Sequence, residues 1–158
     1  MKQQQVNYEN VQMILSDFLN DQDKSFCFIT AASKSMVLRR YCQMHKNAVY
    51  MKVPPTVRES PKSFTLAILE SLGILSIKSH LSEIQLISLI GGALREKQVS
   101  CFVIDDMQEI KYSIRSLELI DMLRLLSEEA QVKFVFTGIE MPELSERAAR
   151  RSIIQKAV

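Results

Sequence analysis

The sequence predicts an α/β fold in which a mostly parallel sheet lies between two layers of helices. Segments rich in β-forming residues alternate with segments whose apolar residues recur at helical spacing, as expected when helices connect parallel strands. The run from Cys101 to Ile104 is wholly apolar, which indicates a strand covered on both faces. With 158 residues, 47% of them hydrophobic, the chain is long enough for one domain with a sizeable core.

Four strands are expected where β-forming residues precede polar or helix-breaking ones, and six helices where apolar residues lie three or four positions apart. The strands are 26–30, 48–53, 99–106 and 132–137, and the helices are 6–20, 36–42, 60–73, 82–97, 116–129 and 142–156. The whole chain, 1–158, is thus expected to form a single domain. It would comprise a leading helix in 1–24, a core sheet in 25–140 and a C-terminal helix in 141–158.

The composition limits the class of protein. A net charge of +2 gives no bulk sign of a nucleic-acid partner, and no apolar run approaches the length of about 18 residues that a membrane span needs. The three cysteines match no zinc-site spacing, and free buried thiols favour a reducing, cytoplasmic location. Basic residues cluster at Arg39-Arg40 and among Arg147, Arg150 and Arg151, where a solvated helix face is the simplest interpretation.

Residues 25–42 have the order strand, short loop, helix. A helix that begins just after a buried strand directs unpaired N–H groups and a partial positive charge at an anion, as in a phosphate-binding loop. Ser33, Lys34 and Ser35 are therefore the candidate nucleotide-binding residues. Lys34 stands where such a loop contacts the β- and γ-phosphates, and Ser35 where a hydroxyl binds Mg²⁺.

This loop lacks the glycines that let a P-loop backbone adopt positive φ and approach phosphates closely. The first glycine in the chain is Gly73, and only Ala31 to Ser33 separate the strand from Lys34. We therefore expect a degenerate Walker A loop, in which nucleotide binding is weakened.

Two acids end the apolar strand 99–106, which is the form of a Walker B element. Asp105 is expected to hold Mg²⁺ through water, and Asp106 to polarise the attacking water as a base. Thr137 ends another strand, and ligands bind beyond the carboxyl ends of parallel strands. We therefore expect Lys34, Asp105 and Thr137 to lie together. The alternative is an acidic loop with no catalytic role.

The order and spacing of these segments resemble the AAA+ ATPases of DNA transposition, namely the B protein of Mu-like phages and the TnsC and TniB regulators. The likeness covers about residues 5–150, with a helix ending LRRY, a later helix ending LGI, a Walker B of the D-E-A-Q type and a G-x-x-E-L-like segment after the last predicted strand. The resemblance implies a P-loop NTPase-like, three-layer AAA+ fold, ATP and Mg²⁺ as cofactors, homo-oligomers on DNA and a transposase partner. It adds Gln108 to the Walker B element and makes Thr137 the polar sensor residue.

Compared with that family, Asp106 replaces the usual Glu, which withdraws the carboxylate by one methylene and is expected to slow hydrolysis. The chain is also expected to lack the fifth strand and helical lid, which would leave a sheet edge unpaired beside strand 26–30. Three interpretations stay open. They are a weak or inactive ATPase, a pseudo-ATPase adaptor that binds DNA or protein, and an α/β domain without nucleotide in which Lys34 is a surface residue.

Overall fold

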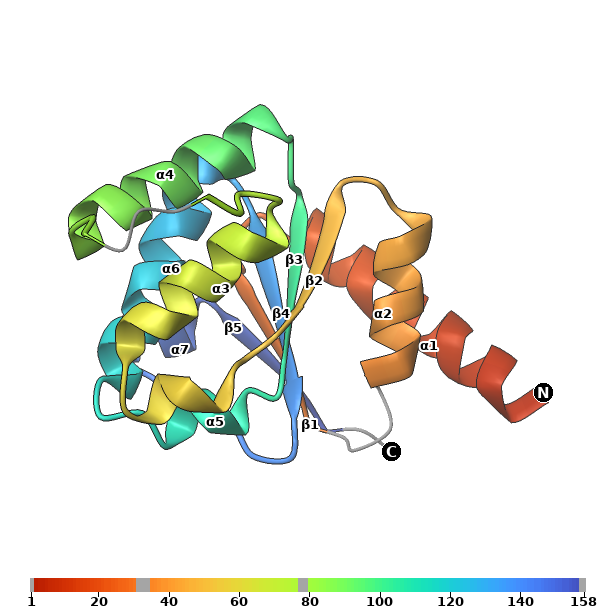
Figure 1. Ribbon diagram of the computed structural model, residues 1–158. Helices are drawn as coiled ribbons and strands as arrows, with labels where there is room; N and C mark the ends of the chain where they lie inside the picture. The colour runs from red at the N-terminus through yellow and green to blue at the C-terminus, as the bar shows by residue number, and fades with distance from the viewer. Residues whose placement is uncertain (1, 31–34, 77–79, 157–158) are drawn as a thin grey trace.

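The computed structural model describes residues 2–30, 35–76 and 80–156. Its centre is a sheet of five parallel strands in the order β2-β3-β4-β1-β5 (Figure 1). The strands are β1 (Phe26–Thr30), β2 (Ala48–Lys52), β3 (Cys101–Asp105), β4 (Lys133–Gly138) and β5 (Ser152–Lys156). The predicted α/β fold with a parallel sheet and four of its strands are confirmed.

Helices cover both faces of the sheet, which gives three layers (Figure 1). One face packs against α1 (Lys2–Asn20) and α2 (Ser35–Met44), and the other against α3 (Pro61–Ser71), α4 (Glu83–Glu96) and α6 (Ser116–Ala130). Shorter helical segments are η1 (Pro55–Arg58), α5 (Gln108–Lys111) and α7 (Glu146–Arg150). None of the helices in the described ranges is long and apolar enough to cross a membrane.

Residues in alternate positions of the central strands divide the core into two clusters. Phe28 and Phe136 face the α3, α4 and α6 side, where their rings stack with centroids 4.6 Å apart. Cys27 and Val135 face α1 and α2 instead. Since Phe28 also pairs with Phe136 in the strand register, a slip by one residue would move the aromatic rings to the wrong face.

The fifth strand corrects two predictions. The C-terminal helix expected in 141–158 is limited to Glu146–Arg150, and the edge expected to be unpaired beside β1 is occupied by β5. Ser152 to Lys156 align in parallel with Phe26 to Thr30. The β-branched pair Ile153-Ile154 favours this extended state. α7 and β5 are each five residues long and nearly adjacent. Segments this short show too little periodicity for the sequence to distinguish the helix from the strand.

The aromatic stack is predicted to be a main source of stability. Phe136→Ala should lower the free energy of unfolding by about 3–5 kcal/mol, because the ring is fully buried and leaves a cavity. Urea denaturation followed by circular dichroism measures this change. Ile139→Ala, three residues on and 66% exposed, should stay within about 0.5 kcal/mol of the original protein. Equal losses in the two variants would contradict the prediction.

Candidate functional site

Ser35 and Asp105 meet at the carboxyl ends of the central strands. Asp105 is the last residue of β3, and Ser35 begins α2 after β1. The Ser35 hydroxyl donates a hydrogen bond to Asp105 Oδ1 at 3.0 Å, although 70 residues separate the two in sequence. The Asp105 side chain is otherwise enclosed, since the residue is only 3% exposed. This contact brings together two of the residues that the sequence proposed as magnesium ligands.

Two further donors bind the Asp105 carboxylate. The Tyr50 hydroxyl donates to Oδ2, and the Asp106 backbone N–H donates to Oδ1 at 2.8 Å. Burial, and after it the hydrogen bond to Asp105, raises the pKa of Tyr50, so the phenol stays a donor over the physiological range. With Ser35, these groups provide the hydrogen bonds that a buried carboxylate requires.

Asp106 has different neighbours. Its backbone is in the left-handed region, with φ of 59°, which a non-glycine residue adopts at an energetic cost. Its carboxylate lies 3.3 Å from Lys52 Nζ through Oδ2, and Oδ1 accepts a hydrogen bond from Gln108 Nε2 at 3.3 Å. The two adjacent acids thus have different side-chain partners. Hydroxyl groups bind Asp105, whereas a lysine and an amide bind Asp106.

Gln108 connects this acidic segment to the end of β4. Its Oε1 accepts a hydrogen bond from the Ile139 backbone N–H at 3.3 Å. A Cβ added to Gly138 would lie 2.3 Å from the same Oε1 and 3.0 Å from the Met107 backbone N, so a side chain at position 138 would displace Gln108 from this contact. Thr137 beside it is fully buried, and its Oγ1 has no hydrogen-bond partner within the described residues. Thr137 therefore lies at the predicted strand end, with an unused hydroxyl.

Ser33 and Lys34 lie outside the described residues, so the predicted convergence of Lys34 with Asp105 and Thr137 stays a prediction. Sequence reasoning missed Tyr50 and Lys52. Both lie on β2, and Lys52 pairs with Asp105 in the strand register. A tyrosine and a lysine near the carboxyl end of a strand were visible in the sequence. What was lacking was the knowledge that this strand lies next to β3.

The arginine clusters proposed as solvated helix faces have mixed surroundings. Arg150 forms an ion pair with Glu146 one turn earlier on α7, and both side chains are largely exposed, as on a solvated face. Arg39 and Arg40 are exposed and lie over the rings of Tyr50 and Tyr8. Arg151 differs, since its guanidinium group binds the buried Ser25.

The oxygen atoms of Ser35 and Asp105 are suitable ligands for a magnesium ion. A serine hydroxyl and a carboxylate are hard oxygen ligands, and Mg²⁺ is usually held by one or two protein carboxylates together with water and phosphate oxygens. Ser35 and Asp105 would hold the ion. Within the described ranges, no three His, Cys, Asp or Glu side chains gather into a metal-binding group.

Solved structures with a similar fold include proteins bound to DNA. The Aeropyrum pernix ORC1 protein in complex with DNA aligns with a TM-score of 0.64 and 14% identity, covering 96% of this chain and 44% of that chain. A chain of Drosophila ORC bound to GC-rich DNA and Cdc6 aligns with a TM-score of 0.62 and 6% identity, covering 98% and 57%. Cdc6p from Pyrobaculum aerophilum aligns with a TM-score of 0.55 and 16% identity, covering 95% and 44%.

This chain therefore spans about half the length of the solved chains that it matches, and identities this low support likeness of fold alone. No curated protein gives a significant match. A family model described as AAA domain matches residues 17–147. Because that match takes in most of the 158 residues, the chain belongs to the AAA domain family.

Proposed function

We propose that the protein binds a magnesium nucleotide, with ATP as the ligand, beyond the carboxyl ends of β1 and β3, and that it hydrolyses this nucleotide slowly. The observation that carries the proposal is the 3.0 Å contact between the Ser35 hydroxyl and Asp105 Oδ1. This contact joins the start of a helix to the end of a buried strand. It lies at the carboxyl ends of the strands, where ligands of parallel α/β domains bind. Membership of the AAA domain family supports the same site.

In this proposal each residue has a distinct role. Ser35 and Asp105 hold the magnesium ion, while Ser33 and Lys34 contact the phosphates. The bound ion would neutralise phosphate charge and orient the phosphates. Thr137 contributes the unpaired hydroxyl at the end of β4, where a polar group can bind the nucleotide or its attacking water.

Slow hydrolysis follows from the surroundings of Asp106. A base that polarises water needs a free carboxylate within hydrogen-bond reach of that water. The Asp106 carboxylate instead contacts Lys52 and Gln108. Its side chain is also one methylene shorter than the usual glutamate, and misplacement by about 1 Å can reduce a rate about a hundredfold.

Removing the proposed magnesium ligands should weaken binding of Mg-ATP. Asp105→Asn should lower the affinity by about tenfold or more, since an amide carries no charge to offset the ion, and Ser35→Ala should have a smaller effect in the same direction. Isothermal titration calorimetry with and without Mg²⁺ measures both. Asp17→Asn, at an exposed position on α1, is the matched control and should bind as the original protein does. Absence of heat from the original protein at millimolar nucleotide would refute the proposal.

Tyr50→Phe should have the opposite effect on Mg-ATP. The Tyr50 hydroxyl occupies Asp105 Oδ2, so its removal frees that oxygen for the ion, and the affinity should rise by roughly threefold or more. The protein without nucleotide should become less stable, because a buried carboxylate loses a donor. Calorimetry and urea denaturation measure the two changes. Tyr112→Phe, which removes a hydroxyl bonded to Glu140, is the control. Weaker nucleotide binding by Tyr50→Phe would contradict this role.

A second candidate is a pseudo-ATPase that retains the fold as an adaptor for DNA or protein. The observation that favours it is that the described side chains already satisfy both acids, Asp105 through Tyr50 and Asp106 through Lys52. Such a protein would need no nucleotide to keep its strand ends in place. The two candidates differ in whether binding of the partner depends on nucleotide.

We further propose that the protein associates with DNA, as a homo-oligomer that serves a transposase or a similar enzyme. Two of the similar solved structures are complexes with DNA, and the sequence resembles transposition ATPases. Arg39 and Arg40 on α2 offer an exposed pair of cations for the phosphate backbone, and an oligomer would repeat that pair along the duplex.

Binding to duplex DNA should therefore depend steeply on salt. Between about 50 and 200 mM salt the affinity should fall by about tenfold or more, and combined Arg39→Gln and Arg40→Gln substitutions should weaken binding and flatten this dependence. Fluorescence anisotropy measures both, with exposed Arg95→Gln as the control. An affinity that stays constant with salt would contradict backbone binding. Lys34→Ala separates the candidates, because it should leave DNA binding unchanged in a pseudo-ATPase and reduce it in a nucleotide-dependent protein.

A further inference from the structure

A polar hollow lies at the amino ends of three strands, whereas Ser35 and Asp105 lie at the carboxyl ends. It has a volume of about 450 Å³ and is lined by Lys24, Lys133 and Arg151 among other residues. These cations precede or begin β1, β4 and β5, three neighbouring strands. β1 is five residues long, so its amino end lies about 16 Å from its carboxyl end. The hollow is therefore separate from the proposed nucleotide site.

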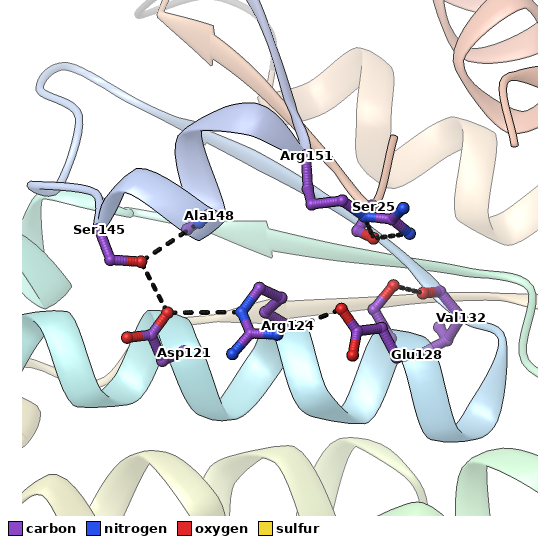
Figure 2. A network of polar contacts seen from close by, with 9 residues as sticks. Ser25, Asp121, Arg124, Glu128, Val132, Ser145, Ala148 and Arg151 are labelled. Carbon is purple, nitrogen blue, oxygen red and sulfur yellow. Dashed lines mark hydrogen bonds and ion pairs between the residues drawn. The ribbon is translucent and has the colours of Figure 1, made fainter. Parts of the chain in front are cut away.

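Arg151 is held firmly and has donors to spare. Its carbonyl accepts hydrogen bonds from the backbone N–H groups of Ser25 and Phe26, at 2.8 and 3.0 Å, which fixes the residue to the start of β1. Its Nε and Nη2 both donate to the single hydroxyl oxygen of Ser25, at 3.1 and 2.9 Å (Figure 2). A guanidinium group carries five N–H donors in a planar fork, so several stay available for an anion.

The two lysines are bound to carbonyl groups and not to carboxylates. Lys24 Nζ donates to the Arg150 carbonyl at 2.8 Å, and Lys133 Nζ donates to the carbonyls of Phe18 and Asp21 at the end of α1. Carbonyl oxygens satisfy hydrogen bonds but do not cancel a charge. Within the described residues, none of these three cations forms an ion pair.

The balance of charge in the hollow is positive. Glu128 is the one acid among its lining residues, and its carboxylate is bound by Arg124 at 3.2 Å. Arg124 lies between Glu128 and Asp121 (Figure 2). Burial lowers the pKa of Lys133; nearby Asp21 opposes this shift, and Arg151 adds to it. The cations outnumber these acids and repel each other, and a bound anion would relieve that repulsion.

We propose that this hollow, formed by Lys24, Lys133 and Arg151, is a binding site for a phosphate group. Phosphate oxygens match the planar donors of arginine and the point charges of lysine. The group could come from a small phosphorylated molecule or from a nucleic-acid backbone. The proposal does not depend on nucleotide binding at the opposite edge of the sheet.

Inorganic phosphate is the first probe. Titration into the original protein, followed by NMR, should shift the backbone amide signals of Ser25 and Val132 saturably, and Lys24→Gln should weaken this binding by about threefold or more. Arg151→Gln should weaken it by about tenfold or more. Lys97→Gln removes the same charge from an exposed position outside the hollow and should bind normally. Arg151→Gln also removes the contact with Ser25, which could alter the fold locally. Lys24→Gln leaves that contact in place and therefore tests the charge alone.

A short DNA duplex distinguishes between the two possible sources of the phosphate group. Shifts of the same amides with DNA that need a higher DNA concentration in Lys24→Gln identify a backbone phosphate, whereas shifts with inorganic phosphate alone identify a small ligand. Asp105→Asn should leave these shifts unchanged, which separates this site from the proposed nucleotide site. The proposal is overturned if neither probe moves the amides of Ser25 and Val132, or if Lys24→Gln and Arg151→Gln bind as tightly as Lys97→Gln.

Discussion

The parallel alignment of β1, β4 and β3 is the constraint on which the candidate site depends. Neighbouring strands are about 4.8 Å apart, so β1 and β3 are separated by about 10 Å across β4. Ser35, the first residue of α2, nevertheless contacts Asp105 at the end of β3 at 3.0 Å, so the start of α2 lies beyond the carboxyl ends of these strands. β4 ends at Gly138, and the absence of a side chain there leaves room for Gln108. The aromatic pair Phe28 and Phe136 fixes the register that aligns these ends.

Protein groups already bind both acids of the site, and this sets the cost of ligand binding. Hydrogen bonds to a charged group are worth about 1.5–3 kcal/mol each, and Asp105 accepts such bonds from Ser35 and Tyr50. An ion that takes the place of either donor must exceed that contribution. Lys52 stands in the same relation to Asp106, although its exposure makes the pair weaker. In the magnesium site that we propose, Ser35 and Tyr50 therefore compete with the ion for the Asp105 oxygens.

The sequence predicted those parts of the fold whose signals are local. Buried runs such as Cys101–Ile104 showed parallel strands, and the rule on carboxyl ends placed Ser35 with Asp105. The β5 strand was missed because its pairing with β1 is a long-range property of five residues. Tyr50 was missed for a related reason, since its role depends on β2 lying beside β3. Spatial order within the sheet was the information that the sequence did not contain.

Net charge was also a poor guide to electrostatics. The total of +2 conceals a separation of charges within the sheet. Asp105 and Asp106 lie at the carboxyl ends of the strands, and Lys24, Lys133 and Arg151 lie at the amino ends. The two edges are about 16 Å apart along β1, about twice the screening length of 8 Å at physiological salt. Each edge therefore presents its own field to a ligand. A bulk charge near zero therefore excludes neither a cation at the carboxyl ends of the strands nor an anion at their amino ends, because the two groups of charges lie apart.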